Sequence, residues 1–151
     1  MYEFLLIIHS WVRWIVLVLG VIIIIQGYTG WKGDLPFTKG HNTRSAIFVG
    51  SFHLQLLLGL LLYFVFSPII DIAFQDFGAA MKNSELRFWA VEHILMMVLA
   101  AVLAQIGRIK IKRADTDGQK HKQAFLWFLA ALVLVLSRIP WSEAGRLLRG
   151  L

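Results

Sequence analysis

Four long apolar stretches place the strongest constraint on how this chain folds. They cover residues of about 4–26, 45–66, 88–107 and 122–139. Each holds roughly 20 residues, the length of helix that crosses the hydrocarbon core of a bilayer, about 30 Å. In lipid, a helix satisfies all of its own backbone hydrogen bonds. We therefore expect an all-α integral membrane protein, built as a four-helix up-down bundle in the lipid bilayer.

The composition supports this fold class and limits the chemistry. Hydrophobic residues make up 58% of the 151 residues, against ~45–50% in soluble domains. The four spans leave short connections, so we expect residues 1–151 to form a single transmembrane domain with no soluble catalytic module. The chain has no cysteine, which excludes disulfides, iron–sulfur clusters and covalently attached haem. Histidine, methionine, carboxylate and backbone groups remain as ligands.

The first apolar stretch is expected to be a retained span and not a signal peptide. It is longer than a signal-peptide core, no basic segment precedes it, and Arg13 lies in its first half. Gly27, Gly30, Gly33 and Pro36 are expected to break this helix.

The basic residues suggest how the helices are oriented. The formal net charge is +6, and nine of the 15 lysines and arginines lie in the connections around residues 27–44 and 108–122. These connections fall on the same side of an up-down bundle, and the positive-inside rule puts that side in the cytoplasm. Both termini and the 67–87 connection are then expected to be periplasmic, with a short interfacial helix from about 69 to 77. No basic recognition element for nucleic acid is present.

Histidines fall one to a span, and this pattern indicates a site. They are His9, His53, His93 and His121, whereas His41 is expected to lie in a loop. With a rise of ~1.5 Å per residue, His9 and His93 both lie roughly 8–10 Å from the outer ends of their helices. Ionisable groups at such depth are costly, so they usually face the bundle interior, a partner or a cofactor.

Two imidazoles on opposed helices are the ligand set of a b-type haem, which needs one neutral nitrogen on each side of a flat ring. Spans one and three are diagonal in an up-down bundle, as are spans two and four. We therefore expect one haem b near the outer face between His9 and His93. A second haem on the inner side would use His53 and His121.

Two arginines are candidates for holding the haem propionates. Arg13 lies four residues after His9 and so shares its helix face. It is expected to pair with a propionate or with Glu92, which sets the charge beside His93. Arg138, near the outer end of span four, is the second candidate.

Other interpretations of these residues remain open. A lone histidine inside a membrane is often a hydrogen-bonded strut between helices. His121 lies between two lysines at the end of a span, and it could instead contact lipid headgroups. Arg13 and Arg138 would reach outward to lipid phosphates. His9, Glu92 and His93 together also have the donor types of a metal site without haem.

Five short motifs resemble the small four-helix bacterial membrane proteins of the cytochrome B-like family. They are HSWVRW at 9–14, FHLQLLLGLLLYF at 52–64, EHILMM at 92–97, QIGR at 105–108 and IPW at 139–141. The resemblance covers nearly the whole chain. It implies a b-type haem carrier in the bacterial inner membrane, with His9, His53 and His93 at matching positions and His121 as a fourth.

Three functions follow as expectations. The first is an electron-transfer protein or subunit, linked to quinol oxidation and to membrane or periplasmic redox partners. The second is a haem-free accessory subunit of a larger membrane complex. The third comes from a looser similarity to membrane haem-containing protoporphyrinogen oxidases, although no clear counterpart of a buried catalytic lysine is seen.

Overall fold

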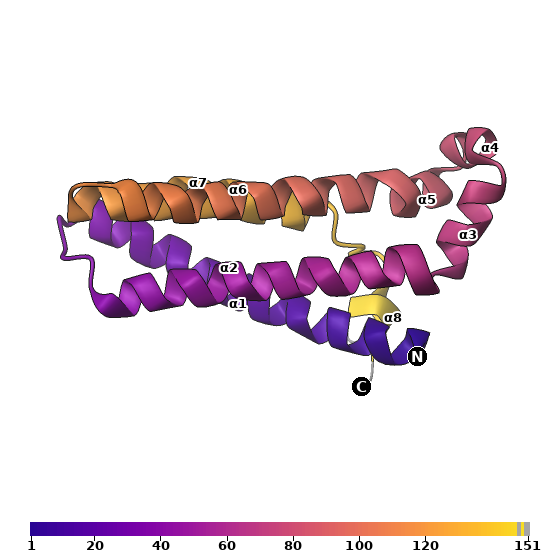
Figure 1. The fold of residues 1–151 in the computed structure, drawn as a ribbon, viewed down its shortest axis with the longest axis horizontal. Helices are drawn as coiled ribbons and strands as arrows, with labels where there is room; N and C mark the ends of the chain where they lie inside the picture. The colour runs from indigo at the N-terminus through magenta and orange to yellow at the C-terminus, as the bar shows by residue number, and fades with distance from the viewer. Residues whose placement is uncertain (148, 150–151) are drawn as a thin grey trace.

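Four long helices form the body of the molecule (Figure 1), and the computed structural model describes residues 1–147 and 149. In chain order they are α1 (Tyr2–Lys32); α2 (Lys39–Leu61) continued by the π-helical η1 (Leu62–Phe66); α5 (Ser84–Arg87), η2 (Phe88–Glu92) and α6 (His93–Arg113) as one helix; and α7 (Asp117–Ser137). Each is long and apolar enough to cross a membrane. The predicted all-helical fold with four long apolar helices is confirmed.

The four helices lie side by side, and the short elements gather at one end. α1 contacts α2 and α7, and α6 contacts the same two helices. Figure 1 shows the α1–α2 and α6–α7 connections at one end. The short helices α3 (Pro68–Gln75) and α4 (Phe77–Lys82) lie at the opposite end, with both termini and α8 (Ala144–Leu147) toward it. The helix predicted near residues 69–77 is thus present as α3.

Side-chain caps explain where the helices begin. The hydroxyl of Thr38 accepts a hydrogen bond from the backbone N–H of His41, and Nδ1 of His41 accepts one from the backbone N–H of Thr38. These two bonds form a reciprocal capping box at the start of α2. Thr116 caps α7 in the simpler way, through the N–H of Gln119. His41 was expected in a loop, and this is wrong: it lies in the first turn of α2, which begins six residues before the predicted start.

Two glycines that were expected to break the first helix lie inside it instead. α1 continues through Gly27 and Gly30 and ends only at Gly33. A Cβ atom on Gly27 would lie 2.8 Å from the backbone nitrogen of Phe125 in α7, and one on Gly30 would overlap the ring of His121. These glycines therefore permit close approach of α1 and α7, as small residues do in membrane helix pairs.

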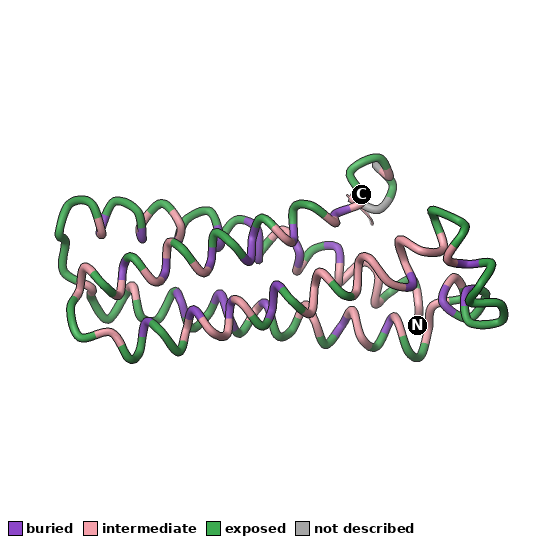
Figure 2. The backbone as a smooth tube through the Cα atoms, turned by 90° about the horizontal axis from the view of Figure 1, so that it is seen from above, coloured by how far each residue is buried: buried purple, intermediate pink, exposed green. Residues whose placement is uncertain are grey.

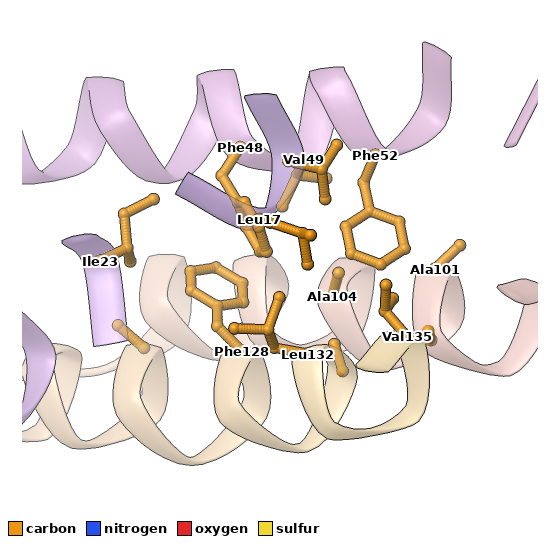
Figure 3. Close-up of a cluster of buried hydrophobic side chains, with 14 of the residues drawn as sticks. Leu17, Ile23, Phe48, Val49, Phe52, Ala101, Ala104, Phe128, Leu132 and Val135 are labelled. Atoms are coloured by element: carbon orange, nitrogen blue, oxygen red, sulfur yellow. The ribbon is translucent and has the colours of Figure 1, made fainter. Parts of the chain in front are cut away.

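The core lies along the middle of the four helices. Phe48 of α2 packs edge-to-face on Phe52 and on Phe128 of α7, with ring centroids 5.6 and 5.0 Å apart. Figure 3 shows these aromatic rings pointing between the helices, with Ala101 and Ala104 of α6 nearby. The short alanine side chains are buried, so α6 approaches its neighbours closely. Figure 2 shows the outward side of the long helices as largely exposed, and many of the exposed side chains are large and apolar.

Candidate functional site

One cavity lies toward the end of the molecule that carries α3 and the termini. Its volume is about 130 Å³, which is far more than the 10–15 Å³ that one water needs. Side chains of α1, α2, η1, α3, η2, α6 and α7 line it, and most of them are apolar. His9 from α1 and His93 from α6 both line this cavity. The structure thus brings together the two histidines that were predicted to lie in one layer.

Two π-helical segments border the cavity. Tyr63 of η1 and Trp89 of η2 both line it. The Tyr63 hydroxyl donates a hydrogen bond of 2.7 Å to the backbone carbonyl of Ala90 in η2. The hydrogen bond thus ties the two segments together beside the cavity. Short π-helical segments inside α-helices often occur at functional sites, and η2 ends directly before His93.

His93 is held by the end of α7. Its Nδ1 lies 2.9 Å from the backbone carbonyl oxygen of Arg138, the residue that caps α7. A carbonyl oxygen can only accept, so Nδ1 carries the proton and Nε2 carries the lone pair. Such a bond from Nδ1 to a carbonyl is the usual way in which a metal-binding histidine is oriented.

His9 is held by α2. The side-chain nitrogen of Gln55 lies 3.2 Å from the Nε2 atom of His9 and 3.0 Å from its backbone carbonyl oxygen. Gly59, one turn further along α2, lies against the same ring: a Cβ atom there would be 3.2 Å from Cε1 of His9. Neither Gln55 nor Gly59 was predicted to belong to the site. Two features of the sequence could have indicated them: Gln55 is a polar residue inside an apolar span, and Gly59 follows four residues later on the same helix face.

Arg13 is the one lysine or arginine among the described residues that line the cavity, and no aspartate or glutamate lines it. The guanidinium is largely buried. It donates to the hydroxyl of Ser10 at 3.0 Å and to the backbone carbonyl of Leu147 at 2.7 Å. That carbonyl, at the end of α8, also accepts from the indole of Trp14 at 2.9 Å. Arg13 thus gives the cavity a positive charge and fixes α8 against α1.

The side chain of Arg138 points to Glu92 and does not line the cavity. Glu92 lies 2.9 Å from Arg87 and 3.7 Å from Arg138, joined through its two carboxylate oxygens. The predicted Arg13–Glu92 pair is therefore replaced by pairs with these two arginines. Arg138 contributes to the site through its backbone carbonyl, which holds His93.

His53 and His121 are not brought together. His53 is exposed, whereas its neighbour Phe52 is buried, because adjacent residues of a helix point about 100° apart. His121 is 1% exposed, with its ring 4.9 Å from that of His41 and in the space left by Gly30. The expected pairing of His53 with His121 across the interior is wrong, and so is the headgroup contact for His121.

The described residues contain no group of three or more histidines and carboxylates that could hold a metal ion by themselves. Glu92 is engaged by two arginines and does not line the cavity. The alternative of a metal site made from His9, Glu92 and His93 therefore has no support in the geometry.

The geometry combines two histidines from α1 and α6, one buried cation and a largely apolar lining in which no described residue is a lysine. These donor types suit a ligand with a metal centre and an acidic edge. The volume of about 130 Å³ is below the roughly 300–1,000 Å³ of pockets for large ligands, so a ligand of that size needs the apolar walls to move apart. Comparison of the chain with family models, with curated proteins and with solved structures finds no match.

Proposed function

We propose that this protein inserts in a membrane as an up-down four-helix bundle and binds haem b in the cavity between His9 and His93. The main support for this proposal is that both histidines line one cavity. In addition, the Nε2 atom of His93 is unprotonated and has a lone pair for a metal. A neutral imidazole nitrogen is a common ligand of haem iron.

The other lining groups suit the rest of a haem. Val16, Leu56, Ile94 and Met97 supply apolar and polarizable contacts for a flat aromatic ring. Arg13 supplies the positive charge that a propionate needs, and none of the described lining residues has a carboxylate that would repel it. Of the six residues predicted to bind the cofactor, these contacts favour His9, His93 and Arg13, and give no such support for His53, His121 or the Arg138 side chain.

The proposed orientation follows from the distribution of charge. The nine basic residues predicted to lie in connections are in the helix turns next to the α1–α2 and α6–α7 connections, at one end of the molecule. The positive-inside rule then puts this end in the cytoplasm of a bacterial cell, and the haem cavity toward the periplasmic face.

We propose electron transfer as the activity of this site. Bound haem supplies one-electron chemistry. The chain would tune it through Arg13, which favours an anionic neighbour, and through the apolar lining, which keeps water away. No lysine lines the cavity, so a protoporphyrinogen oxidase that uses a buried lysine has no support here. A membrane quinol or a periplasmic redox subunit would be the partner.

A reduced-minus-oxidised spectrum of the purified protein tests the proposal. We expect a Soret peak and an α-band of a b-type haem, either as isolated or after addition of haem, at close to one haem for each chain. A protein that shows neither band after addition of haem would contradict the proposal and favour the haem-free accessory subunit. Haem bound to a chain with a His93→Ala change at the same occupancy would contradict the assigned site.

A further inference from the structure

The two histidines of the cavity are held by different kinds of partner. His93 Nδ1 donates to a backbone carbonyl of Arg138 at 2.9 Å. His9 Nε2 lies 3.2 Å from the side-chain nitrogen of Gln55. A neutral imidazole has one N–H and one lone pair, so the partner decides which nitrogen is able to bind a metal.

The tautomer of His9 follows from its second contact with Gln55. The same Gln55 nitrogen lies 3.0 Å from the backbone carbonyl oxygen of His9, which can only accept. This atom of Gln55 is therefore the NH₂ group, and it also donates to His9 Nε2. His9 Nε2 is then the acceptor and Nδ1 carries the proton. Within the described part of the chain, buried His9 Nδ1 has no hydrogen-bond partner.

The lone pairs of the two histidines thus differ in availability. The lone pair of His93 is on Nε2, which makes no hydrogen bond to any described residue. The lone pair of His9 is occupied by Gln55. Gly59 faces the same ring at its Cε1 atom, so two residues one turn apart on α2 hold His9 in this position.

We infer that Gln55 is a positioning residue that withholds His9 from the iron of a haem in this cavity. His93 would then hold the iron, and the haem would be able to bind a small diatomic ligand as well. The inference rests on the proposed function, because it concerns a haem in this cavity. It assigns to the site a second capability, the binding of a neutral diatomic molecule of the carbon monoxide class, which a haem held firmly by two histidines binds poorly.

Carbon monoxide titration of the reduced, haem-loaded protein tests this inference. A Gln55→Leu change keeps the size of the side chain and removes the donor, which frees His9 Nε2 to coordinate. We expect the affinity for carbon monoxide to fall roughly fivefold, the equivalent of one hydrogen bond of about 1 kcal/mol. The visible spectrum of the reduced variant should also shift toward six-coordinate, low-spin haem.

Gln105→Leu is the matched control, since Gln105 lies on α6 about 18 Å along the helix from His93 and does not line the cavity. It should leave the affinity unchanged. A second variant, His9→Ala, should retain haem and bind carbon monoxide at least as tightly as the unmodified protein. Loss of haem in His9→Ala would overturn the inference.

A haem-loaded Gln55→Leu protein with the spectrum and carbon monoxide affinity of the unmodified chain would also overturn the inference, while leaving the proposed haem site intact. Failure of the unmodified protein to bind haem would instead overturn the proposed function, and the inference with it. The two failures are therefore told apart by the haem content of the unmodified protein.

Discussion

Replacing His93 with alanine is expected to abolish haem binding. The change removes the one cavity imidazole whose lone pair is free of hydrogen bonds to the described residues, and it leaves the Arg138 carbonyl without its donor. Loss of a partner that only orients a ligand costs roughly 10- to 100-fold in metal affinity, so loss of the ligand itself should lower haem affinity by more than about 100-fold. Haem titration followed at the Soret band measures this.

His53→Ala is the matched control for this prediction. It removes the same side chain from a span, but His53 is exposed and does not line the cavity. Haem affinity should stay within about twofold of the unmodified protein, in keeping with the small effects of surface changes. Addition of imidazole to a His93→Gly protein should restore haem binding. Equal losses in the alanine variants of His93 and His53 would contradict the assignment of His93 as the ligand.

Gly27→Ala is expected to destabilise the packing of α1 on α7. The added Cβ atom would lie 2.8 Å from the backbone nitrogen of Phe125 and 3.1 Å from the backbone oxygen of His121. Backbone atoms cannot turn away as a flexible side chain can, so the helices must separate. Overpacking of this kind costs typically 1–3 kcal/mol. Thermal unfolding in detergent, followed by far-ultraviolet circular dichroism, should show a lower midpoint temperature.

Gly50→Ala separates this effect from the helix propensity of alanine. Gly50 lies inside α2, and a Cβ atom there would meet nothing within 4 Å. Alanine is favoured over glycine in a helix interior by roughly 0.5–1 kcal/mol, so this variant should be as stable as the unmodified protein or more stable. Destabilisation of both variants by the same amount would show that the close approach at Gly27 is not responsible.

Much of the fold could be predicted because it depends on local properties of the chain. Length and apolar composition predict the four long helices, and Pro68 marks the end of the second one, since proline supplies no backbone N–H and sits at the start of α3. Gly27 and Gly30 were wrongly predicted to break the first helix, because the prediction considered only local properties of the chain. Their role depends on Phe125 and His121, about 90 residues away, which a local pattern does not reveal.

The candidate site could be predicted in part. The depth of His9 and His93 along their helices follows from a rise of 1.5 Å per residue, and both line one cavity. The direction of the His53 side chain around its helix axis was predicted wrongly: it was expected to face the interior, and it is exposed. The contribution of Arg138 also depends on packing, because its backbone carbonyl, and not its guanidinium, reaches His93.

The order of apolar and charged residues by itself determined an all-helical chain with four membrane-length helices, at least one histidine in each and positive charge at one end. Tertiary packing decided which histidines share a cavity, which of their nitrogens carries the lone pair, and that Gln55 holds one of them. The physical reason is that helix length and hydrophobicity act along the chain. Rotation of each helix about its axis, and the hydrogen bonds that rotation permits, depend on contacts between residues that are distant in sequence.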